Sequence, residues 1–111
     1  MNEHTNILKE FDRVSYGDAE VKEKLIQAFL SQKPDEIRII NNCLQEENWK
    51  ELRNIAHKLK SSFIYLNMPR PIELTEALRV KAGADVEATK KQAKELVIIC
   101  NEIIEILKSK S

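Results

Sequence analysis

The stretch Asn48–Leu66 reads NWKELRNIAHKLKSSFIYL, and its apolar residues recur every three or four positions. Placed on an α-helix at about 100° per residue, with Trp49 at zero, six of them fall in one arc between about 240° and 340°. Asn48 stands just before the pattern and is a residue type that caps helix N-termini well. We therefore predict an amphipathic helix here, one face of which lies in a hydrophobic core. That face comprises Leu52, Ile55, Ala56, Leu59, Phe63 and Leu66.

The same periodicity continues on both sides and predicts three further long helices. Their expected ranges are roughly residues 18–46, 71–82 and 85–108, beside 48–66 for the stretch above. Connections of about two to five residues force neighbouring helices to run antiparallel. A brief amphipathic segment from Thr5 to Phe11 precedes them. The predicted fold is therefore all-α: one domain over residues 1–111, an antiparallel up-down four-helix bundle with a short additional N-terminal helix.

The helix expected over residues 18–46 contains a proline. Asp18 is well placed as its N-cap, but Pro34 has no N–H and disturbs the turn before it. The apolar phase nevertheless continues across this position, so we predict one long helix kinked near Pro34. One row of this helix reads Ile26, Lys33 and Ile40, in which the lysine is the exception.

Composition excludes several classes of function. The chain has 111 residues, 42% hydrophobic and 32% charged, with 18 basic and 18 acidic residues. This neutrality argues against nucleic-acid binding, and no apolar run approaches the roughly 20 residues of a membrane span. Two glycines cannot build a phosphate-binding loop. With no signal peptide at the N-terminus, Cys43 and Cys100 are expected to be reduced core residues of a cytoplasmic protein.

One residue of the stretch Asn48–Leu66 lies away from the face of the helix that is predicted to enter the core. His57 falls at about 80° on the helix, so we expect it to be exposed. A neutral imidazole nitrogen is a nucleophile near pH 7, and accepting a phosphoryl group would add roughly −1.5 to −2 of charge. Lys60, one turn further on, could compensate that charge, and Ser61 is small enough for a partner to approach the ring. The remaining neighbours on this face are Lys50, Arg53 and Ile64.

The segment Ala56–Phe63, AHKLKSSF, closely resembles the signature of histidine-containing phosphotransfer (Hpt) domains, Ala-His-x-x-Lys followed by a small pair and an apolar residue. The resemblance extends in helix order from about Asp18 to Leu107. It implies a phosphorelay intermediate that accepts a phosphoryl group on His57 from the aspartate of one response-regulator receiver domain and passes it to another. Lys60 and Ser61 would surround the phosphohistidine, and Lys50, Arg53 and Ile64 would contact the partner. The resemblance implies no cofactor in this chain, since Mg²⁺ belongs to the receiver.

Two positions, Ser61 and Asn67, depart from the family pattern. Ser61 stands where many members have glycine, and we expect so small a residue to preserve activity. Asn67 replaces a glycine at the helix end, and asparagine is the next-best residue for a left-handed cap. Some members steady the imidazole with a glutamine on the third bundle helix, and counting residues puts Arg79 near that place.

Other functions remain possible from the sequence. Hydrolase chemistry would need an orienting carboxylate and an enclosed pocket around His57. The dimerisation domain of a sensor kinase would place an acidic residue where Lys58 stands. The main alternative is a helical bundle that only binds a partner, as an adaptor or a degenerate Hpt domain. We expect a monomer that has no kinase or nucleotide-binding activity of its own and that contacts neither nucleic acid nor a membrane. The domain would be either an independent protein or part of a larger hybrid sensor kinase.

Overall fold

The computed structural model describes residues 6–110, with the side chain of Lys110 excepted, and this part of the chain is helical without any strand. The all-α prediction is therefore confirmed for the described residues. The helices are α1 (Ile7–Val14), α2 (Ala19–Glu46), α3 (Trp49–Tyr65), α4 (Pro69–Lys81) and α5 (Val86–Lys110).

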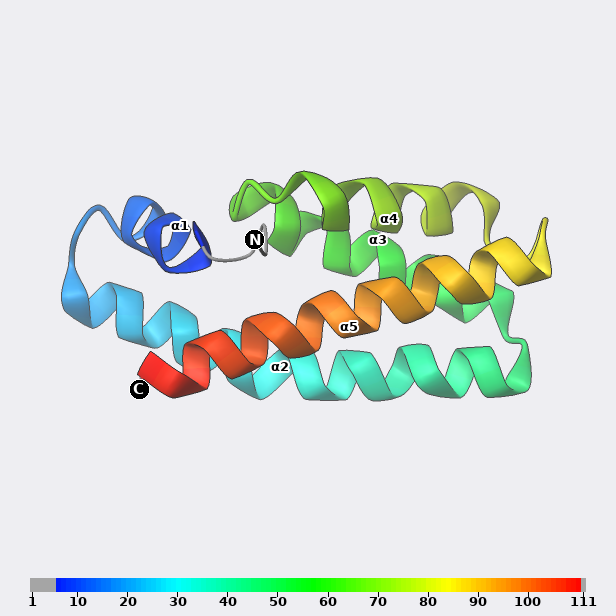
Figure 1. Ribbon diagram of the computed structural model, residues 1–111, viewed down its shortest axis with the longest axis horizontal. Coiled ribbons are helices and arrows are strands. Elements are labelled where there is room, and N and C mark those ends of the chain that lie inside the picture. Colours follow the sequence, from blue (N-terminus) through cyan, green and yellow to red (C-terminus); the bar gives the residue numbers. More distant parts are fainter. Residues whose placement is uncertain (1–5, 111) are drawn as a thin grey trace.

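The four long helices lie side by side, and each one in chain order runs opposite to the one before it (Figure 1). Helix α2 packs against α3 and α5, while α4 packs against the same two helices. The short helix α1 packs on α2. It is also fixed to the end of α3, because the Arg13 guanidinium donates a 2.7 Å hydrogen bond to the Tyr65 carbonyl.

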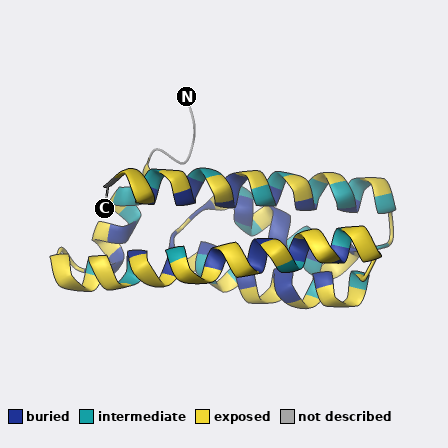
Figure 2. Ribbon diagram, turned by 90° about the horizontal axis from the view of Figure 1, so that it is seen from below, coloured by how far each residue is buried: buried dark blue, intermediate teal, exposed yellow. Residues whose placement is uncertain are grey.

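A continuous apolar core fills the space between these helices. Figure 2 shows buried and exposed segments alternating along each helix, as expected for amphipathic helices that share a core. Among the apolar residues that recur at helical spacing, Leu25 is partly exposed and lies at the margin of the core. The buried ones include Phe29, Leu52, Leu59, Phe63, Leu96, Cys100 and Ile103.

Side-chain caps mark the starts of α2 and α3. The Asp18 carboxylate accepts hydrogen bonds from the Glu20 and Val21 amides, and the Asn48 side chain accepts one from Glu51, which confirms both predicted caps. Asn67, which lies just after the C-terminus of α3, adopts a left-handed φ of 55°, as expected for the residue that terminates a helix.

Some helix limits differ by a few residues from the approximate ranges expected from the sequence. Helix α4 begins at Pro69 rather than residue 71, because prolines fit the first turn of a helix, where no N–H is needed. Helix α5 continues to Lys110, past the predicted end at residue 108. The predicted N-terminal segment starts at Thr5, which lies outside the described residues, and α1 extends three residues beyond its predicted end at Phe11.

Helix α2 passes through Pro34 as one helix and carries an ion pair into the core. The Lys33 side chain is 2% exposed and that of Glu36 is 8% exposed, and Nζ lies 2.8 Å from Oε1. The ammonium also donates a 3.2 Å hydrogen bond to the Ser62 hydroxyl of α3 and lies 4.8 Å from the centre of the Phe29 ring. The lysine that interrupts the apolar row is therefore buried together with its counter-ion.

The turn between α4 and α5 depends on a glycine. Gly83 has a φ of +91°, and a Cβ placed on it would lie 2.7 Å and 2.8 Å from two ring atoms of Trp49. Trp49 itself is partly buried against the core, so the ring has little freedom to move. Both the backbone conformation and the close approach of the indole therefore require glycine here.

We expect Gly83→Ala to lower the free energy of unfolding by roughly 2–3 kcal/mol, since it combines a strained φ with overpacking against Trp49. Gly17 is a matched control: its φ is +75°, but a Cβ placed on it would have no atom of the described residues within 4 Å. Gly17→Ala should therefore cost about 1 kcal/mol. Urea denaturation of both variants measures the difference, and equal losses would show that Trp49 imposes no constraint.

Candidate functional site

His57 lies on the outer face of α3 and is exposed. Its neighbours Ala56 and Leu59 are both buried in the core, so the helix phase directs the imidazole outward. The exposure predicted from the sequence is confirmed. A partner protein can therefore reach the ring directly.

Lys60, one turn along α3, does not stand alone beside His57. Its Nζ lies 2.5 Å from Oε2 of Glu76 on α4, and the lysine side chain is 28% exposed. The same carboxylate accepts hydrogen bonds of 2.6 Å and 3.1 Å from the Arg79 guanidinium. The positive charge expected next to His57 is therefore paired with an acidic residue that sequence analysis did not identify.

The contacts between α3 and α4 also locate Arg79. Lys60 pairs with Glu76, and nearer the start of α3 the Arg53 guanidinium donates a 2.9 Å hydrogen bond to the Ala82 carbonyl. Between these two contacts, the antiparallel register brings Arg79 to the level of His57. The residue count that placed Arg79 near the family's glutamine position agrees with this register.

The remaining residues of the predicted docking surface differ in availability. Lys50 and Ser61 are exposed, and the large apolar side chain of Ile64 is 54% exposed. Tyr65 beside it is 53% exposed. Arg53 is half-buried and engaged at the end of α4, so its guanidinium already has a structural partner.

The electrostatics of the cluster keep Glu76 ionised. Hydrogen bonds from Arg79, and then from Lys60, lower the pKa of the Glu76 carboxyl to about 2, and the same contact with Glu76 raises the pKa of Arg79. Because folding lowers the pKa of Glu76, its pairing stabilises the protein at pH values above the ordinary glutamate pKa. That contribution is lost as the pH falls toward 2.

The two thiols do not compete with His57 as nucleophiles. Cys43 and Cys100 are both free and buried. Burial raises the pKa of Cys100 to about 12 and is also the main cause of the raised pKa of Cys43. Both therefore remain protonated and inaccessible near neutral pH.

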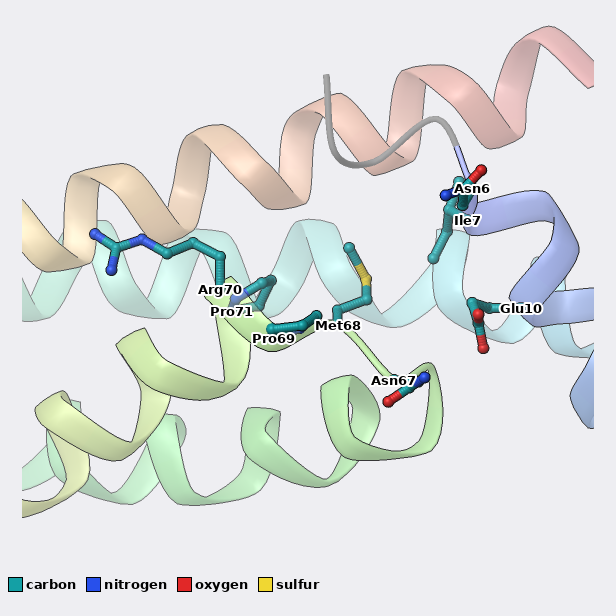
Figure 3. Close-up of a pocket in the computed structure, with 8 residues that line it drawn as sticks. All are labelled: Asn6, Ile7, Glu10, Asn67, Met68, Pro69, Arg70 and Pro71. Atoms are coloured by element: carbon teal, nitrogen blue, oxygen red, sulfur yellow. The ribbon is translucent and has the colours of Figure 1, made fainter. Parts of the chain in front are cut away.

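A cavity of about 270 Å³ lies away from His57, between α1 and the turn from α3 to α4 (Figure 3). Arg70 is the cationic residue among those that line it, and its guanidinium points away from α1 in Figure 3. That group instead binds Glu95 on α5 at 2.6 Å and 2.7 Å, and also Glu73. Among the described residues, those that line this cavity thus offer no nucleophile beside an available cation.

Comparison with protein-family models matches the Hpt domain model over residues 24–107, which is most of the chain. The chain belongs to the Hpt family. Comparisons with curated proteins and with solved structures give no match. The resemblance drawn from AHKLKSSF is therefore confirmed at the level of the family.

Membership in the Hpt family implies phosphotransfer in a two-component phosphorelay, in which Hpt domains interact with receiver domains and are not kinases. Among the described helices of this Hpt domain, none combines the length and apolar character needed to cross a membrane.

Two residues near His57 differ from what the motif alone indicates. Ser61, one turn after the histidine, adds an exposed hydroxymethyl group where many members have glycine. Glu76 was missed because its link to Lys60 spans two helices, and no spacing within one helix reveals such a contact.

Proposed function

We propose that this Hpt domain is a phosphorelay intermediate in which His57 carries the phosphoryl group. The observation that supports this most strongly is the exposed imidazole on α3, at the histidine of the AHKLKSSF motif and within the region matched to the family. The proposal takes residues 1–111 as one domain whose long helices form an antiparallel up-down bundle. It also takes the domain to act as a monomer in the cytoplasm.

The proposed chemistry is a transfer between a carboxylate and an imidazole. A neutral ring nitrogen of His57 attacks the phosphorus of an aspartyl phosphate on a receiver domain; the new P–N bond forms as the P–O bond breaks, and the aspartate leaves as a carboxylate. The proton on the other ring nitrogen stays there or passes to water. In the onward step the bond changes are reversed: the carboxylate of a second receiver's aspartate attacks the phosphorus, and the P–N bond to His57 breaks. Mg²⁺ would be supplied by the receiver, and this chain needs no cofactor of its own.

The proposed docking surface surrounds the histidine. Ile64 offers an exposed apolar contact and Lys50 a positive charge toward the acidic pocket of a receiver. Arg53 would contact the partner through the part of its side chain that its bond to α4 leaves accessible. Because such encounters are transient, we expect the interface to bury less than about 1,200 Å². The full set is Lys50, Arg53, His57, Lys60, Ser61 and Ile64.

The test is transfer from a phosphorylated receiver domain of the same organism in the presence of Mg²⁺. The protein should acquire label that survives alkali and is lost in acid, because a phosphoramidate is stable in base and labile in acid. ATP alone should give no label.

The second candidate function is a bundle that only binds its partner. It is favoured by the pairing of Lys60 with Glu76, which leaves less positive charge for a phosphoryl group. Binding without transfer from any cognate receiver would establish that alternative.

We expect Lys60→Ala to weaken phosphoryl retention while changing the free energy of unfolding by less than about 0.5 kcal/mol. The stability effect is small because Glu76 keeps its two bonds to Arg79 when the lysine is removed. Lys58→Ala is the matched control, since Lys58 is an exposed lysine of the same helix on the other side of His57. Label half-lives and urea denaturation of both variants measure the two effects. Equal label half-lives in the two variants would show that Lys60 does not stabilise the phosphoryl group.

A further inference from the structure

The Glu76 carboxylate joins two cations that come from different helices. It binds Lys60 of α3 at 2.5 Å and Arg79 of its own helix at 2.6 Å and 3.1 Å. Lys60 lies one turn from His57 along α3, and the helix register puts Arg79 at the level of the imidazole. In the unphosphorylated protein, both cations beside the proposed phosphorylation site are therefore already paired with the Glu76 carboxylate.

A phosphoryl group on His57 would compete with Glu76 for these cations. It carries roughly −1.5 to −2 charges and three strong acceptor oxygens, against a single charge on the carboxylate. Lys60 is held by one contact and has a flexible stem, whereas Arg79 holds Glu76 through two nitrogens. Lys60 is thus the partner that can turn to the phosphoryl group, while Arg79 keeps Glu76 in place.

We propose that Glu76 is a positioning residue for phosphotransfer: it holds Lys60 beside His57 in the unphosphorylated protein and gives it up when the phosphoryl group arrives. This inference rests on the proposed function of His57. The contact between Glu76 and Lys60 must break on phosphorylation, and the remaining carboxylate repels the new anion. Glu76 therefore lowers the affinity of the domain for the phosphoryl group and favours onward donation to a receiver.

Stability alone does not account for this cluster. The side chains of Lys60, Glu76 and Arg79 are 28–39% exposed, and ion pairs of such exposure contribute little to folding. Glu76, with its pKa lowered to about 2, also stays charged throughout the pH range in which the imidazole is a nucleophile. Its charge is therefore present at every transfer event.

The experiment measures the equilibrium distribution of phosphoryl groups between this domain and a cognate receiver. Glu76→Gln should shift that equilibrium toward His57 by about two- to fivefold, the range expected for one charge at a partly exposed site. Glu73→Gln is the control: it removes an equal charge one turn earlier on α4, from a residue paired with Arg70. Only an interaction that differs between the two states shifts the equilibrium, so the control should leave it unchanged.

A second variant pair tests whether the effect acts through Lys60. In a Lys60→Ala background, Glu76→Gln should shift the equilibrium less than in the wild-type background, because no competition for the ammonium remains. An unchanged equilibrium, a shift toward the receiver, or an equal shift in Glu73→Gln would each overturn the inference while leaving His57 as the acceptor. Wild-type protein that takes no label from any receiver would overturn the proposed function and this inference together.

Discussion

Glu36→Leu is expected to lower the free energy of unfolding by about 3–5 kcal/mol, because it leaves the ammonium of Lys33 in the core without its counter-ion. The ammonium would keep only the Ser62 hydroxyl and the face of Phe29, which do not balance a charge so far from water. Lys33→Met should be similarly costly, since it leaves the Glu36 carboxylate buried without its partner.

The double variant Lys33→Met/Glu36→Leu should recover most of this loss or exceed the stability of the wild type. Both charges are then absent, and apolar side chains of similar size fill the same space. The exposed pair of Asp35 and Arg38 is the control on the same helix, and Asp35→Ala should cost less than about 0.5 kcal/mol. Urea denaturation of the variants tests the prediction. Single-variant losses as small as that of the exposed pair would mean that water reaches Lys33.

His57→Gln is expected to reduce phosphoryl acceptance to background while the free energy of unfolding changes by less than about 0.5 kcal/mol. Glutamine has no nucleophilic nitrogen at neutral pH, and the exposed position makes no core contact that the substitution would remove. His4→Gln is the matched control, because His4 is the other histidine of the chain. Filter-binding of label from a phosphorylated receiver measures both. A His57→Gln protein that still takes label would place the chemistry elsewhere.

Features that depend on neighbouring residues along the chain were predictable. Asp18 and Asn48 were recognised as caps because an Asx side chain reaches amides two or three residues ahead. The exposure of His57 followed from helix phase alone, since the residues around it fix which side of α3 faces the core. The start of α4 was misplaced because a proline can either end a segment or occupy the first turn of a helix.

Features that depend on contacts between helices were not predictable. Lys33 was noted only as an exception in an apolar row, and its burial became clear from Glu36 and from Ser62 on α3. The pairing of Lys60 with Glu76 likewise depends on the register of α3 against α4, which no periodicity within a helix determines. The sequence therefore identified His57 as the proposed nucleophile, whereas the ion pairing of its surroundings became clear only from the structure.

The central claim, that His57 carries the phosphoryl group, is tested most directly by ³¹P NMR after transfer from a phosphorylated receiver to protein labelled with ¹⁵N-histidine. We predict a phosphorus signal coupled to an imidazole nitrogen, present in the wild type and in His4→Gln and absent in His57→Gln. A phosphorus signal without coupling to imidazole nitrogen, or one that persists in His57→Gln, would contradict the claim.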